Sequence, residues 1–152
     1  MRRWAQAAAP LLLLLITGTT TDHPAMADDG QILFVKGRIA DAEYLDGFIP
    51  SAPSGNAPFI EGGDYRVNLA ITEVLIGQPR QSNLHLTLTI TDAPHGDPHP
   101  EIFLLVEQLP AGQFQPIDWD FAANGVCMGE ETSRQYGIEK AIRDIQKKYP
   151  CK

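Results

Sequence analysis

Two runs of alternating apolar and polar residues dominate the middle of the chain, between residues 64 and 91. The first run covers residues 65–71 and the second covers residues 84–90, with the turn-forming sequence GQPR at 77–80 between them. Because successive side chains of a strand point to opposite faces, a period of two is typical of half-buried strands. The pattern therefore predicts two strands that pair as the central hairpin of an antiparallel sheet.

Three shorter apolar segments predict the remaining strands, at residues 31–40, 101–109 and 117–127. The first of them contains four consecutive apolar residues, 32–35, which indicates burial on both faces. Gly37 marks an expected bulge or bend, and the strand could run on toward Tyr44. Residues 46–63 are rich in proline and glycine, which predicts a long loop. The apolar residues of this loop would either cover the edge of the core or face a partner.

The period changes near the C-terminus, from about Thr132 onward. Apolar residues recur there at helical spacing, which predicts one C-terminal helix that Pro150 ends. The apolar positions are Ile138, Ala141, Ile142, Ile145 and Tyr149. Five antiparallel strands in a chain of this size close most easily as a small barrel of the OB type. The expected fold is therefore mainly β, a five-stranded OB-like antiparallel barrel followed by a C-terminal α-helix.

The first 27 residues have the order of a secretory signal peptide. Two arginines precede an apolar run, and Ala25 and Ala27 occupy the −3 and −1 positions of a cleavage site. The alternative is an uncleaved membrane anchor, but the apolar run is about 10 residues long, where a span needs about 20. We therefore expect a secreted or periplasmic protein whose single domain covers residues 28–152, with no stable membrane span after cleavage.

The charge of this mature chain limits its partners. It carries 10 basic and 18 acidic residues, a net charge of −8. It has no run of basic residues and no basic segment interleaved with aromatic residues, so nucleic acid is not an expected partner. An acidic surface favours a basic partner.

The chain has two cysteines, Cys127 and Cys151, both in the mature part. In an exported protein an even number of cysteines is typical of disulfide bonding, which here allows one intramolecular bridge. The bridge would clamp the C-terminal helix onto the sheet. The alternatives are two free thiols or a shared metal ion, although the close Cys-x-x-Cys spacing of zinc sites is absent.

The sharpest polar cluster is His95, Asp97 and His99, in the proline-rich segment 92–100. Imidazole and carboxylate groups can together bind a transition metal. The prolines exclude a helix that would bring the two histidines onto one face, so the alternative is a solvated loop with Asp, Gly and Pro in its turns.

Paired carboxylates and catalytic motifs give little support for an enzyme. Asp118 and Asp120 could share one face of a strand and act as acid and base, or they could form an exposed acidic edge beside a buried Trp119. No nucleophile elbow, phosphate-binding loop, dinucleotide-binding glycine pattern or zinc-protease motif occurs in the sequence. We therefore expect no catalytic residues and no cofactor.

The succession of motifs resembles the superfamily of netrin modules and tissue inhibitors of metalloproteinases. The motifs, in order, are FVKGRI, YRVNLAITEVLIGQ, LHLTLTI, IFLLVEQL and NGVC, within residues 31–127. The resemblance implies an OB-type barrel with flanking helices that binds protein partners or extracellular matrix. The inhibitors begin with a cysteine that chelates the zinc of their target, whereas this mature chain would begin at Asp28, and their dense disulfide framework is also missing.

The leading functional hypothesis is an exported, non-enzymatic module that binds a protein or acts like an inhibitor. The alternative is a metal-binding protein or metal-dependent enzyme that uses the His/Asp cluster of residues 92–99. A third possibility is a structural component of the cell envelope. The sequence predicts neither the partner nor the oligomeric state.

Overall fold

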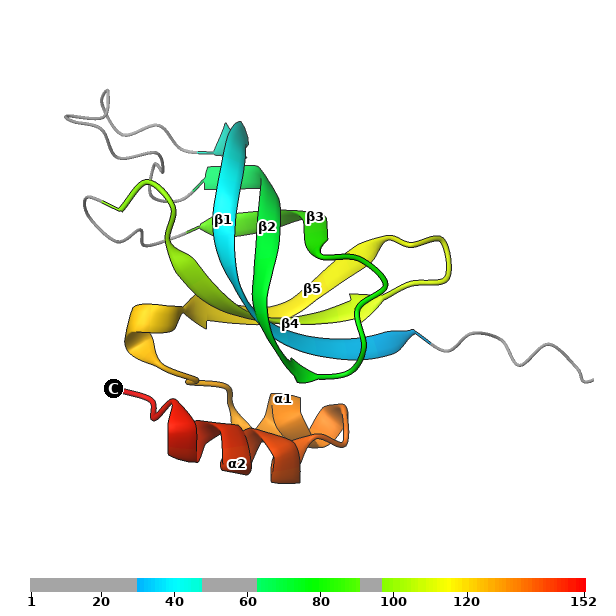
Figure 1. Cartoon of the computed structure of the whole chain (residues 1–152), viewed down its shortest axis with the longest axis vertical. Coiled ribbons are helices and arrows are strands. Elements are labelled where there is room, and N and C mark those ends of the chain that lie inside the picture. Colours follow the sequence, from blue (N-terminus) through cyan, green and yellow to red (C-terminus); the bar gives the residue numbers. More distant parts are fainter. Residues whose placement is uncertain (1–29, 48–62, 91–96) are drawn as a thin grey trace, which may run out of the picture.

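The computed structural model describes residues 30–47, 63–90 and 97–152. This part of the chain folds into five strands followed by three short helical segments (Figure 1). The strands are β1 (Gln31–Gly47), β2 (Gly63–Ile76), β3 (Asn83–Ile90), β4 (Glu101–Gln108) and β5 (Phe114–Phe121). The helical segments are the 3-10 turn η1 (Ala122–Asn124) and the α-helices α1 (Glu130–Gln135) and α2 (Glu139–Lys148).

All strands pair antiparallel in one sheet with the order β3-β2-β1-β4-β5. The central strand β1 is long and strongly curved, and its register against β2 shifts between Lys36 and Gly37. A side chain at Gly37 would clash with the side chain of Leu69, only 2.7 Å from the position of the missing Cβ. The bend predicted at this glycine is therefore confirmed.

The inner face of the curved sheet holds the larger core, to which all five strands contribute. The two predicted alternating runs supply much of it, because every second residue is buried in the first half of β2 and throughout β3. The edge strands β3 and β5 approach each other without pairing in the described residues, so the sheet curls without closing. The mainly β class is confirmed, and closure as a barrel is not.

A second core lies between the outer face of β1 and β4 and the helices. Phe34 and Phe103 provide its sheet side, and Ile142 of α2 provides its helix side. β1 and β4 are therefore buried on both faces, which explains their runs of consecutive apolar residues. Figure 1 shows both α-helices gathered below this part of the sheet.

The C-terminal region corrects the sequence analysis at two points. The single predicted helix is two helices, because Gly137 adopts a φ of 66° that ends α1 and turns the chain into α2. The last strand lies at Phe114–Phe121 instead of 117–127, and its predicted second half forms η1 and an extended segment. Within the described residues, no helix is long and apolar enough to cross a membrane.

Candidate functional site

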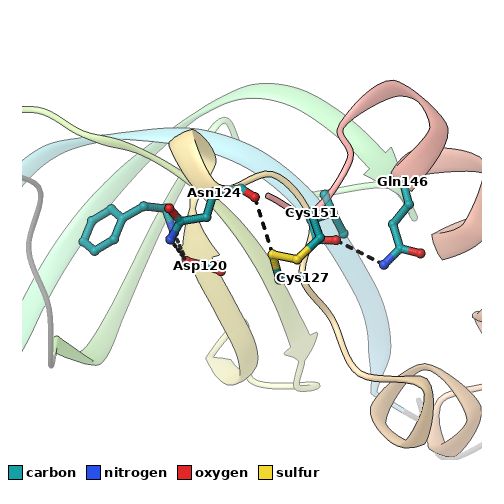
Figure 2. Close-up of a disulfide and its surroundings, with 7 residues drawn as sticks. Asp120, Asn124, Cys127, Gln146 and Cys151 are labelled. Atoms are coloured by element: carbon teal, nitrogen blue, oxygen red, sulfur yellow. Dashed lines mark hydrogen bonds between the residues drawn. A yellow bond between two sulfur atoms is a disulfide. The ribbon is translucent and has the colours of Figure 1, made fainter.

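The predicted disulfide between Cys127 and Cys151 is present and fastens the end of the chain to the segment that follows η1 (Figure 2). Backbone hydrogen bonds flank it on both sides. Val126 N donates to Tyr149 O over 3.0 Å, and Lys152 N donates to Asn124 O, also over 3.0 Å. The bridge therefore lies inside a short paired stretch of backbone.

Gly125 makes this close pairing possible. Its φ is 82°, and a Cβ at this position would lie 2.0 Å from the carbonyl oxygen of Pro150. Figure 2 shows Gln146 of α2 reaching back to the same segment, where its Nε2 donates to Val126 O over 3.1 Å. The sulfur of Cys127 lies 3.4 Å from Asn124 O, a sulfur–oxygen contact because a bridged sulfur has no hydrogen to donate.

The carboxylates Asp118 and Asp120 share the outer face of β5, as they pair with the outward-facing Leu105 and Phe103 of β4. Burial raises the pKa of Asp118 and the nearby charge of Asp120 adds to the rise, while a hydrogen bond from the backbone of Trp119 opposes it. Both carboxylates are half-buried, so the expectation of an exposed acidic edge is wrong. Trp119 packs against the inner core as expected, although it is only half-buried.

This carboxylate pair lacks the geometry of an acid–base site. The cavity beside it is about 50 Å³, which is too small for a substrate-sized molecule. Oδ1 of Asp120 already accepts hydrogen bonds from Phe121 N and Asn124 Nδ2, both over 2.7 Å. The role that the structure shows for Asp120 is to hold the turn that leads to the disulfide.

The described part of the predicted metal cluster is occupied by local hydrogen bonds. Asp97 Oδ1 accepts from the backbone N–H of His99 over 2.9 Å, and His99 Nδ1 donates to Ile39 O over 3.1 Å. His95 lies outside the described residues, and no group of three metal-ligating side chains gathers within them. The metal site remains a prediction, as do the signal cleavage residues Ala25 and Ala27, which also lie outside.

The second half of β1, the first half of β2 and β3 form a part of the sheet whose outer surface carries no described helix. The outward-facing side chains of β1, β2 and β3 lie there in register, and we call this surface the bare face. Its exposed members are Asp41, Glu43, Arg66, His85 and Thr87, with the half-buried Asn68 among them. Arg66 Nη1 lies 2.7 Å from Glu43 Oε2, an ion pair between two adjacent strands. In Figure 1 this half of the sheet is the upper one, away from the helices.

Both connections that the structure does not describe, 48–62 and 91–96, start from one end of this half. Gly47 pairs with Gly63, and Gly63 pairs with Ile90, so the three residues form one row across the sheet. Acidic residues lie near this row, because Asp46 of β1 is opposite Asp64 of β2 in the strand register. Leu45 precedes Asp46 at a register shift of β1 and is 40% exposed, one of two large apolar side chains so exposed in the described residues.

The sequence predicts a first strand at residues 31–40 that could run on toward Tyr44, but it does not show that the acidic residues of this extension lie beside β2 and β3 on the bare face. β1 continues to Gly47 through a register shift near Asp41, which changes which alternate residues face outward. The signal was present in the sequence, since Ala42 and Tyr44 alternate with Asp41 and Glu43.

Comparisons of the chain with protein-family models, with curated proteins and with solved structures find no match. Function is therefore argued from the geometry of the fold.

Proposed function

We propose that this chain is an exported, non-enzymatic module that binds a protein partner through the bare face and the adjoining row of Gly47, Gly63 and Ile90. The observation that carries the proposal is the uneven cover of the sheet. Helices bury one half of the outer surface, while the other half stays exposed at the end from which two long connections start. Exposed sheet surfaces next to the connections between strands are widely used for recognition.

Export is supported by two features of different kinds. The first 27 residues have the order of a signal peptide, and the described chain contains a disulfide, which persists in oxidising compartments. We therefore infer that the mature protein starts near Asp28 and acts outside the cytoplasm.

We also infer that the curled sheet is a partly open barrel of the OB type. The support is the topology, because β1 pairs with both β2 and β4 while β3 and β5 approach each other. In OB folds the surface of strands 2 and 3 and the neighbouring loops bind ligands. The bare face includes the corresponding strands of this protein.

The negative charge of the proposed surface indicates the kind of partner, a protein with a positively charged surface. Residues 28–128 contain four basic and fourteen acidic residues, whereas the helical end from residue 129 onward contains six basic and four acidic ones. On the bare face Arg66 is paired with Glu43, and Asp41 and Asp46 add further negative charge nearby. A positively charged protein surface complements this arrangement, and such complementarity speeds association and selects the partner.

Site-specific photo-crosslinking tests the proposal. A photoreactive amino acid replaces Thr87 on the bare face, or Glu131 on α1 as a control position of similar exposure. After irradiation in the cells that express the protein, Thr87 is expected to give one discrete crosslinked species that is absent from Glu131. No discrete species at Thr87, or the same species from both positions, would contradict the proposal.

A further inference from the structure

A groove beside the helices, on the outer surface of the sheet, has the features of a small-molecule site. It lies where β1 and β4 meet η1 and the end of α2, and its volume is about 380 Å³. That volume falls within the roughly 300–1,000 Å³ of known ligand pockets. Aromatic and methyl groups of Phe103, Ala122, Ala123 and Tyr149 form its apolar wall.

The aromatic wall is held in place by several contacts. The ring of Tyr149 lies 4.9 Å from that of Phe103, and its hydroxyl donates to Glu73 Oε2 over 2.5 Å. Lys148 lies 2.8 Å from the other oxygen of Glu73 and 4.9 Å from the Tyr149 ring centre. The ring is thus fixed from three sides, so a ligand that stacks on it loses little conformational entropy in the protein.

Among the described residues that line the groove, Arg38 is the cation with the more distant ion-pair partner. Lys36 pairs closely with Glu101, at 2.6 Å, so these two charges compensate each other. Arg38 reaches the same carboxylate only at 3.9 Å, and its side chain is 58% exposed at the rim. Asp97 is the other acid of the lining, and its Oδ1 is held by the backbone N–H of His99. A planar guanidinium with free N–H groups fits a carboxylate with two parallel hydrogen bonds.

We propose that this groove binds a small molecule that carries a carboxylate on a flat apolar group. The carboxylate pairs with Arg38, and the flat group lies against Tyr149 and the alanines of η1. None of the residues named for the bare face lines this groove, so the test of the groove does not depend on the proposed protein partner. Failure of one proposal therefore leaves the other standing.

The test is a titration of the isotope-labelled mature protein with 2-naphthoate, followed by amide chemical shifts in NMR spectra. We expect saturable shifts centred on Arg38, Phe103, Ala123 and Tyr149. The uncharged analogue 2-naphthylmethanol is expected to bind about tenfold more weakly, since it lacks the charge-assisted hydrogen bonds.

Two arginine variants separate a specific site from general attraction to positive charge. Arg38→Gln is expected to weaken naphthoate binding about tenfold or more. Arg134→Gln on α1 is the control, since this arginine is also exposed but does not line the groove, and the variant is expected to bind like the wild type. The spectra of both variants report directly whether the fold is retained. No saturable shift, shifts centred elsewhere, or equal weakening by the two variants would overturn the proposal.

Discussion

Removing the disulfide tests how the C-terminal helices are attached to the sheet. In the variant C127S/C151S the paired stretch beside Gly125 keeps its two backbone hydrogen bonds, but the covalent link is lost. The folded contacts of α2 with Phe34 and Phe103 are unchanged. The expected effect is therefore mainly on the unfolded chain, which gains conformational freedom when the loop is opened.

The size of the effect follows from the length of that loop. The two cysteines are 24 residues apart in sequence. The loop-closure relation for a loop of this length gives about 3.5 kcal/mol at 25 °C. Since small domains have free energies of unfolding of about 5–15 kcal/mol, the variant is expected to fold but to lose a large share of its stability.

The measurement is urea denaturation of the oxidised mature protein, followed by far-UV circular dichroism. The variant should unfold at lower urea concentration, with a free energy of unfolding about 3–4 kcal/mol below that of the wild type. Reductant supplies the control, because it should lower the wild type to the level of the variant and leave the variant unchanged. A loss below about 1 kcal/mol would refute the argument that the bridge restricts the unfolded chain.

Four further substitutions test individual features of the structure, each by urea denaturation. Glu73→Gln should destabilise the protein at pH 7 and have no effect in acid, because hydrogen bonds from Lys148 and Tyr149 lower the pKa of Glu73. The stabilisation by the charged carboxylate is therefore present above its ordinary pKa of 4.5 and is lost as the pH falls through the lowered value. Asp118→Asn should have the opposite profile, with a gain in stability at neutral pH that vanishes below pH 3.8, because burial raises the pKa of this carboxyl and its charged form costs folding free energy. Gly125→Ala should cost at least about 2 kcal/mol, from the left-handed backbone and the clash with Pro150; Gly112→Ala, with a φ of 74° and no atom near its Cβ position, should cost only about 1 kcal/mol. Equal costs at the two glycines, or pH profiles of the same sign at the two acids, would contradict these explanations.

The strands were predictable where one face of the sheet is buried. The period of two in β2 and β3 follows directly from burial of Leu84, Leu86 and their neighbours on the inner face. The disulfide was predictable as well, since the expectation of export favours a bridge and two cysteines leave one intramolecular pairing. The sequence is sufficient to predict the two alternating strands and the disulfide because each depends on only a few residues.

The site was harder to predict because it depends on how distant segments are arranged. β1 continues to Gly47 because it pairs with β2 as far as Gly63, an outcome that the alternation of residues 41–44 alone does not require. Arg38 and Tyr149 are more than 100 residues apart and line one groove only after α2 packs on the sheet. The spacing of residues along the chain does not predict that these two side chains line one groove. The break between the two helices, in contrast, was visible in the sequence, because Gly137 interrupts the helical pattern.

The most direct test of the central claim, that the bare face binds a basic protein partner, is the crosslinking yield from Thr87 after charge reversal. Glu43→Lys with Asp46→Lys places two positive charges at the proposed surface, and Glu130→Lys with Glu131→Lys makes the same change of net charge on α1. We predict that the first pair lowers the yield about tenfold or more and that the second leaves it unchanged. An equal fall in both, or no fall in the first, would contradict the account.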